Sequence, residues 1–190
     1  MKKSIGAKLF AMPNPVWVVG TYGENNNPNI MTAAWAGICC SNPPCVAVSL
    51  QKIRATYENI IERKAFTISI PSSKQAAEAD YVGIVSGKTT DKFTMANLTA
   101  VKSEFVDAPY VGEFPLILEC RLLHTLEIGL HTQFIGEIID MKVDESILNE
   151  KDIPSLEKVL PFVYSASNRA YYTVGEQLGK AYSIGTKFKG

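Results

Sequence analysis

The 190-residue sequence has no excess of charge of either sign, because 19 lysines and arginines balance 19 aspartates and glutamates. Non-specific binding to nucleic acid or to an anionic membrane needs a basic excess, so we expect neither partner. No apolar run approaches the roughly 18 to 20 residues of a membrane span. The basic N-terminus is interrupted by Pro13 and Pro15 before a signal peptide could form. We therefore expect a cytoplasmic protein.

The sequence also lacks the short motifs of several enzyme classes. It contains no GxGxxG, GxxxxGK[ST], GxSxG or HExxH. Its two histidines, His124 and His131, are seven residues apart. These absences argue against a Rossmann-type dehydrogenase, a P-loop enzyme and a zinc hydrolase, and we expect no metal site.

The cysteines are few and contain no CxxC pair. Adjacent Cys39 and Cys40 are expected on opposite sides of a strand, which makes joint ligation of one metal awkward. We expect Cys39, Cys40, Cys45 and Cys120 to be reduced, buried thiols rather than a redox site.

Short apolar segments separated by turn residues predict a mainly antiparallel β-barrel with a few helices, forming a single domain over residues 1–190. Strands are expected at 16–21, 29–35, 36–41, 45–50, 65–70, 116–128 and 134–143, with a turn at Gly129 between the last two. Helices are expected at 55–64 with Thr56 as N-cap, at 72–85 with Ser72 or Ser73 as N-cap, and at 155–160. Residues 161–190 show no clear pattern and are expected to form a C-terminal arm that packs over the body or onto a partner.

Three polar clusters lie at the edges of expected strands. In the segment 29–35, small residues leave the backbone open to a flat ligand, and Trp35 offers an indole for stacking; a plain strand with a core tryptophan is the alternative. In 51–56, Arg54 and Thr56 stand at a helix start, which favours an anion, although this could be an exposed basic turn. The loop 86–93 places two lysines among hydroxyls, which suits a phosphate but also a solvated loop.

The order of these motifs resembles the FMN-binding split-barrel flavin reductase family, and within it most closely the flavoredoxins. The resemblance is carried by NIMTAAW at 29–35, SLQKIRAT at 49–56, SGKTTDKF at 86–93, and His131 followed by FIGEI at 134–138. It covers about residues 10–185. It implies a six-stranded antiparallel Greek-key split β-barrel and a homodimer with FMN sites near the subunit interface.

Carried over position by position, the resemblance implies a complete set of FMN-binding residues. The flavin would be surrounded by Asn29, Thr32, Ala33, Ala34 and Trp35, with the backbone of Ser49, Leu50 and Gln51 near the ring. The phosphate would meet Arg54, Thr56 and Lys92, and the loop that closes on the ligand would contain Ser86 and Gly87. His131 and Tyr164 would line the site from other segments; the alternatives are a satisfied histidine at a strand end and a tyrosine in core or dimer packing.

The function expected from this resemblance is an FMN-dependent oxidoreductase that passes electrons from NADH or NADPH through the flavin to an acceptor, such as a redox partner protein. The flavin carries the chemistry, so no acid–base residue is demanded, and His131 is the one candidate for a catalytic role. Two alternatives remain open: an FMN-binding electron carrier without its own substrate turnover, and a flavin-storage or regulatory module.

Overall fold

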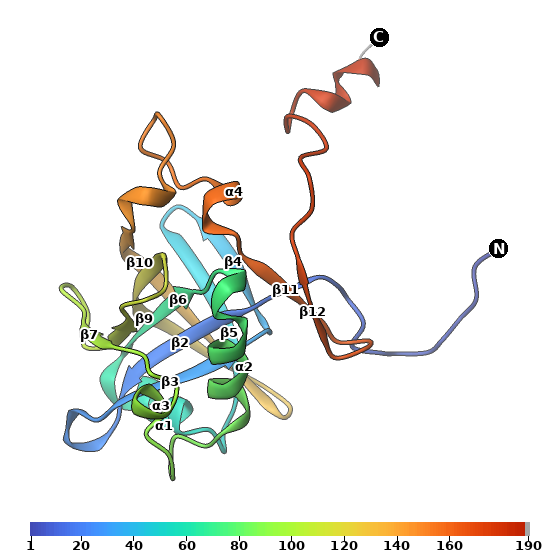
Figure 1. The fold of residues 1–190 in the computed structure, drawn as a ribbon. Helices are drawn as coiled ribbons and strands as arrows, with labels where there is room; N and C mark the ends of the chain where they lie inside the picture. Colours follow the sequence, from blue (N-terminus) through green and yellow to red (C-terminus); the bar gives the residue numbers. More distant parts are fainter. Residues whose placement is uncertain (189–190) are drawn as a thin grey trace.

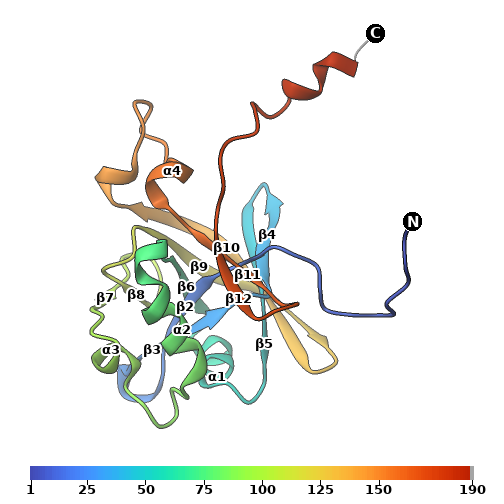
Figure 2. The same ribbon diagram turned by 45° about the vertical axis from the view of Figure 1, so that its right-hand side comes forward.

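A computed structural model describes residues 1–188, and antiparallel β-structure dominates it (Figures 1 and 2). The central sheet has seven strands in the order β3-β2-β6-β9-β10-β5-β4, and every neighbouring pair is antiparallel. The strands are β2 (Trp17–Tyr22), β3 (Pro28–Ala33), β4 (Ala36–Ser41), β5 (Pro44–Gln51), β6 (Ala65–Ile70), β9 (Leu116–Ile128) and β10 (His131–Val143). The expected pairing of the last two strands is confirmed, whereas the sheet has seven strands rather than the expected six.

The two edge strands of this sheet, β3 and β4, are consecutive in the chain. Only Ala34 and Trp35 separate them, and a linker of this length spans no more than about 10 Å. The sheet therefore curls until one end of β3 lies close to the start of β4. The Ser49 N–H of β5 donates a hydrogen bond of 2.8 Å to the Trp35 carbonyl and fixes this linker against the next strand.

Strand β2 contributes to two apolar clusters, because successive side chains of a strand point to opposite faces. Val19 packs in a cluster with Phe66 and Phe134, and Val18 packs in the other cluster with residues of the helices. At Gly136, an added Cβ would lie 2.5 Å from the Phe66 ring. The glycine of the FIGEI segment is thus required by the close approach of this buried phenylalanine.

Three short helices, α1 (Ala55–Arg63), α2 (Ala76–Ile84) and α3 (Lys92–Met95), all pack against β3. The N-cap of α1 is Arg54, with no side-chain cap, so the predicted Thr56 cap is wrong: Thr56 lies inside the helix and its hydroxyl accepts from Asn29. The predicted Ser72 cap is confirmed, since Ser72 and Gln75 form a capping box at the 3-10 turn η2 (Ser73–Gln75), which leads into α2. The remaining helical elements are η1 (Glu24–Asn26), η3 (Glu145–Ile147), α4 (Leu156–Val159) and η4 (Ile184–Phe188).

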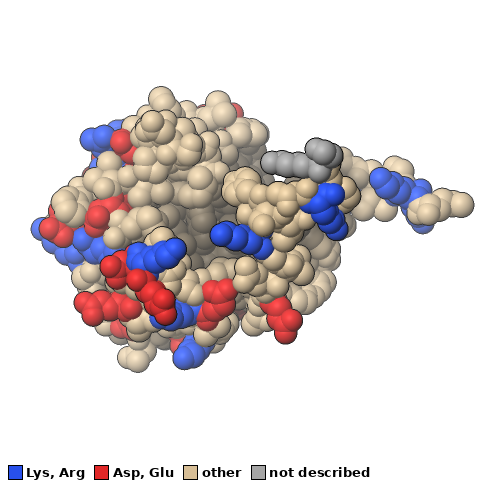
Figure 3. All heavy atoms as spheres, turned by 90° about the horizontal axis from the view of Figure 1, so that it is seen from above, with Lys and Arg blue, Asp and Glu red and all other residues tan. Residues whose placement is uncertain are grey.

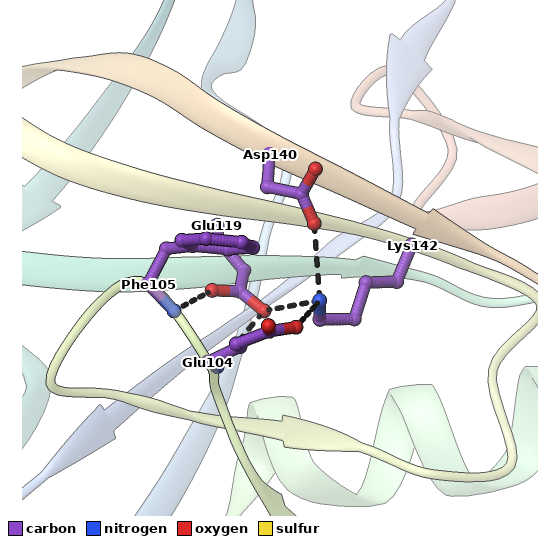
Figure 4. Close-up of polar contacts among 5 residues, drawn as sticks. All are labelled: Glu104, Phe105, Glu119, Asp140 and Lys142. Carbon is purple, nitrogen blue, oxygen red and sulfur yellow. Dashed lines mark hydrogen bonds and ion pairs between the residues drawn. The ribbon is translucent and has the colours of Figure 1, made fainter.

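A small hairpin, β7 (Ala100–Lys102) and β8 (Pro109–Val111), is fastened to the central sheet by the buried carboxylate of Glu119 (Figure 4). This carboxylate accepts backbone hydrogen bonds from Glu104 (3.3 Å) and Phe105 (2.8 Å), and it lies 3.4 Å from Lys142 Nζ. Hydrogen bonds from Lys142 to Glu104 and Asp140 raise the pKa of the lysine. The cluster holds the hairpin's loop against β9 and β10.

The C-terminal segment, which shows no clear pattern in the sequence, contains two strands. β11 (Phe162–Ser165) pairs with β12 (Ala170–Thr173) and with β1 (Asn14–Pro15) near the N-terminus, forming a three-stranded sheet. Residues 174–188 are exposed, and this segment lies on the same side of the body as the exposed residues 1–13 (Figures 1 and 3).

The expectation that all four cysteines are buried is wrong for two of them. Cys45 and Cys120 are buried, whereas Cys39 and Cys40 are exposed. Both lie at the end of the edge strand β4, where the four residues Ile38 to Ser41 are all exposed. A β-bulge between Ile38 and Cys40 makes Cys39 an extra residue of this strand. Over residues 1–188, no helix is long and apolar enough to cross a membrane. Nor does this range hold three or more His, Cys, Asp or Glu side chains grouped so that they could bind a metal.

Candidate functional site

Two adjoining cavities lie where β3, β5 and β10 meet the helices. The first has a volume of about 160 Å³ and is lined by Met31, Thr32, Ala33, Ala34, Trp35, Ser49, Leu50, Gln51, Arg54 and His131. The second has a volume of about 250 Å³ and is lined by Asn29, Met31, Ile53, Arg54, Ala55, Thr56, Ser86, Gly87 and Lys92. Met31 and Arg54 line both cavities, so the two are neighbouring parts of one site.

The first cavity is formed by strand ends that the topology brings together. The end of β5 and the start of β10 meet in register, with His131 opposite Gln51. The linker Ala34 and Trp35 approaches the same place from β3, held there by Ser49. Its lining includes the small side chains of Ala33, Ala34 and Ser49 and the indole of Trp35, which can stack on a flat ring.

In the wall of the second cavity, one hydrogen bond joins β3 to α1. The Asn29 side-chain amide donates to the Thr56 hydroxyl at 3.0 Å, and both residues are buried. The other side-chain atom of the amide, Asn29 Oδ1, is buried and has no hydrogen-bond partner among the described residues. A Cβ at Gly87 would collide with this oxygen. Because Gly87 has no side chain, the loop after α2 can lie close to Asn29 Oδ1, an acceptor that a ligand could use.

Lys92 supplies a buried positive charge to the second cavity. It is 4% exposed, and Nζ donates a hydrogen bond of 2.7 Å to the Val82 carbonyl in the last turn of α2. An ammonium has three donors, so two are left for other partners. Within residues 1–188, neither Lys92 nor Arg54 forms an ion pair with a carboxylate. Burial, together with the smaller effect of the nearby Arg54 charge, lowers the pKa of Lys92 to about 8.

This arrangement selects for an anion. The positive charges of Lys92 and Arg54 repel each other, and an anion bound between them would offset that repulsion. The uncapped N-terminus of α1, where Arg54 is the N-cap residue, adds the positive end of a helix dipole at the same place. The second cavity is therefore suited to a phosphate group.

The loop between α2 and α3 is held in place on both sides. Ser86 Oγ accepts the Lys88 N–H at 3.2 Å, and Lys88 Nζ lies 3.3 Å from the Glu58 carboxylate of α1. At the far end, Asp91 accepts the Thr94 N–H as the N-cap of α3 and so positions Lys92. The loop that carries Ser86 and Gly87 thus closes one side of the second cavity.

All of the predicted site residues except Tyr164 line one or other cavity. Tyr164 lies on β11, opposite Asn14 in register, with its ring centroid 5.8 Å from that of Tyr171. The Thr32 hydroxyl donates to the Ala79 carbonyl of α2, so this side chain joins the strand to a helix as well as lining the site.

Three lining residues were missed in the sequence analysis, namely Met31, Ile53 and Ala55. Met31 shares the strand face of Asn29 through the two-residue period of a strand, and that signal could have identified it.

The chain matches the family model described as a flavin reductase like domain over residues 9–174. The chain belongs to the flavin reductase-like family. Its structure is similar to that of the flavoredoxin of Desulfovibrio vulgaris (Miyazaki F), with a TM-score of 0.93 and 56% identity over 97% of this chain and 100% of that one. It is also similar to flavoredoxin from Methanosarcina acetivorans, with a TM-score of 0.92 and 32% identity over 98% of each chain.

A curated relative in this family is an uncharacterized protein of Archaeoglobus fulgidus. It is 33% identical over 112 residues, which are 59% of this chain and 63% of that protein. The match thus spans a little less than two thirds of that relative's length. The flavin reductase-like family is therefore identified by the whole-length likeness to flavoredoxins and by the family match over most of the chain.

Proposed function

We propose that this chain is an FMN-binding oxidoreductase of the flavin reductase type. The observation that carries the proposal is the buried Lys92, which lines the second cavity together with Arg54 and has no carboxylate partner among residues 1–188. This cavity adjoins the one beside Trp35. A phosphate at one end and a flat surface at the other match the two ends of FMN. Family membership supports the same ligand.

The residues present fit this cofactor. Lys92, Arg54 and Thr56 would hold the phosphate, and Asn29 Oδ1 would accept a hydrogen bond from a hydroxyl of the ligand. The indole of Trp35 and the backbone of Ser49 to Gln51 would flank the flavin ring, with His131 beside it. When bound, FMN accepts electrons from a donor and passes them to an acceptor.

The chain's own residues then orient the ligand and exclude water from it. The buried Lys92 would fix the anion, and the residues that line the first cavity would hold the ring. A nicotinamide would supply electrons to the bound flavin.

We also propose that the curled sheet forms the split barrel of the family, in a single domain over residues 1–190 with 161–190 as a C-terminal arm, and that two copies form a homodimer. Bulky apolar side chains support the dimer. They are exposed on the β9–β10 hairpin, at Leu126, Ile128 and Leu130, and along the arm, at Leu178 and Tyr182. A partner chain that covers these side chains would remove them from water, which is favourable.

The experiment that tests the function is the absorption spectrum of the purified protein, followed by anaerobic reduction with NADH and separately with NADPH. An oxidoreductase of the proposed type shows a flavin spectrum that bleaches with at least one nicotinamide. A protein whose flavin is bleached only after a reductase is added is the alternative, an electron carrier. A purified chain that shows no flavin and takes none up from added FMN would contradict both.

A further inference from the structure

Three of the four cysteines lie around the turn of the β4–β5 hairpin, at its end far from α1 (Figure 2). Cys40 on β4 is the direct cross-strand neighbour of Cys45 on β5, and Cys39 is the extra residue of the adjacent bulge. The Cys40 thiol donates to the Asn42 carbonyl at 3.5 Å, and the Cys45 thiol donates to the Pro43 carbonyl at 3.3 Å. Both side chains therefore turn toward the same loop.

The register makes this pair suitable for a disulfide. The pair Ser41 and Pro44 closes the hairpin around a two-residue loop. Directly opposite residues of an antiparallel pair have Cα atoms about 4.5 Å apart when the pair is non-hydrogen-bonded and about 5.5 Å apart when it is hydrogen-bonded. Cys40 and Cys45 are directly opposite in register. Both separations fall within the range that a disulfide spans, roughly 4.4 to 6.8 Å.

The two thiols differ in their access to solvent. Cys40 is exposed, whereas Cys45 is only 3% exposed. Burial raises the pKa of the Cys45 thiol, and the neighbouring Cys40 and Cys39 side chains raise it further. An exposed thiol beside a buried one gives a fixed order of events: the exposed sulfur meets a reagent from solvent first, and the buried sulfur reacts second.

We propose that Cys40 and Cys45 form a dithiol–disulfide site that exchanges with low-molecular-weight disulfides. The Cys40 thiolate attacks one sulfur of the small disulfide, which forms a mixed disulfide and releases one thiolate. Cys45 then loses its proton and attacks the Cys40 sulfur, releasing the second thiolate. Two protein thiols are oxidised to one disulfide, the small disulfide is reduced to two thiols, and the protons pass to the released thiolates.

This site is separate from the candidate FMN site. Cys45 and Gln51 are six residues apart on one strand, which corresponds to roughly 20 Å at the rise of an extended chain. The proposal therefore does not depend on the proposed function.

The test is to equilibrate the reduced full-length protein with mixtures of oxidised and reduced glutathione, block remaining thiols with N-ethylmaleimide under denaturing conditions, and digest with trypsin. Residues 9–52 contain Cys39, Cys40 and Cys45 and no lysine or arginine before Lys52, so they form one peptide. The expected product is this peptide with N-ethylmaleimide on one cysteine only and a disulfide between the other two. The disulfide lowers the mass of the peptide by two hydrogens.

Four variants assign the pair, and far-UV circular dichroism checks that each is folded. Cys39→Ser and the buried-thiol control Cys120→Ala should still form the disulfide, whereas Cys40→Ser and Cys45→Ala should lose it. The proposal is overturned if the parent protein keeps all three thiols, or carries only glutathione adducts, at the most oxidising ratio. It is also overturned if Cys40→Ser or Cys45→Ala still forms a disulfide within the peptide, because Cys39 would then be a partner.

Discussion

The side-chain amide of Asn29 donates a hydrogen bond of 3.0 Å to the hydroxyl of Thr56, and this contact joins β3 to the first turn of α1. Because the amide nitrogen is used in this way, Asn29 Oδ1 is fixed in position, without a hydrogen-bond partner among residues 1–188. The N-cap of the helix is Arg54, and the Thr56 hydroxyl accepts from β3 instead of capping the helix. One hydrogen bond therefore joins the strand to the helix and positions the acceptor in the second cavity.

The first prediction concerns the charge of Lys92. Lys92→Met keeps the length and apolar part of the side chain but removes the ammonium, so one charge-assisted hydrogen bond to the phosphate is lost. We expect FMN affinity to fall by roughly 5- to 150-fold, equivalent to about 1 to 3 kcal/mol. Fluorescence titration with FMN measures it. The matched control is Lys88→Met, whose exposed ammonium pairs with Glu58 and whose loss should change the affinity far less. Equal affinities in the parent and both variants would remove Lys92 from the site.

The second prediction is a pH dependence of FMN binding. The pKa of Lys92 is lowered from 10.5 to about 8 by burial and by Arg54, so without a ligand the amine loses its proton as pH rises through 8. A bound phosphate dianion favours the charged amine and raises this pKa again. FMN affinity should therefore decrease above pH 8, with proton uptake on binding.

Calorimetric titrations in buffers of different ionisation enthalpy measure this uptake, and Lys92→Met should abolish it.

The stability of the ligand-free protein should depend on pH in the opposite direction from FMN affinity. The folded pKa lies below the unfolded value, so the cost of burying the charged amine is present below pH 8 and is relieved as pH rises from 8 to 10.5. If the contribution of Lys92 to the free energy of unfolding decreased between pH 8 and 10.5, the predicted direction would be wrong.

The third prediction tests the approach of the loop to Asn29. Gly87→Ala places a Cβ against Asn29 Oδ1, so the loop or the amide must move, and we expect weaker FMN binding. Gly37→Ala is the control, because no atom lies within 4 Å of the added Cβ. Dissociation constants for FMN that rise in both variants, or in neither, would show that the close contact at Gly87 does not shape the site.

The fourth prediction is the oligomeric state. Each chain has a mass of 20.8 kDa, and the exposed apolar residues of the β9–β10 hairpin and the arm should be covered by a second copy related by a two-fold axis. Sedimentation velocity at micromolar concentration should show twice the mass of one chain. A single species of 20.8 kDa would contradict the dimer.

The sequence predicted local features well where a local signal determines the structure. The strands at 65–70 and 116–128 and the turn at Gly129 follow from β-branched and apolar runs with clear ends, and each appears in the structure. The resemblance to the flavin reductase family, carried by the order of the polar clusters, named most of the residues that line the two cavities but not Met31, Ile53 or Ala55.

Features that depend on distant partners could not be predicted in this way. Strand β11 pairs with β12 in a local hairpin, but its other neighbour is β1, which lies about 150 residues earlier, for example Asn14 opposite Tyr164. Cys39 and Cys40 are exposed because the end of β4 lies at the edge of the sheet, and the order of strands in a sheet is not visible in the sequence. Thr56 was assigned as a cap from the preference of threonine for caps, whereas the helix begins one residue earlier and the Thr56 hydroxyl accepts from Asn29.

The most direct test of the account is to compare the binding of FMN and riboflavin to the same ligand-free protein. The two ligands share the ring and the ribityl chain and differ in the phosphate, which Lys92, Arg54 and Thr56 are proposed to hold. We predict that FMN binds more tightly than riboflavin in the parent protein and that Lys92→Met narrows the difference. Riboflavin binding as tightly as FMN in the parent protein would contradict the account.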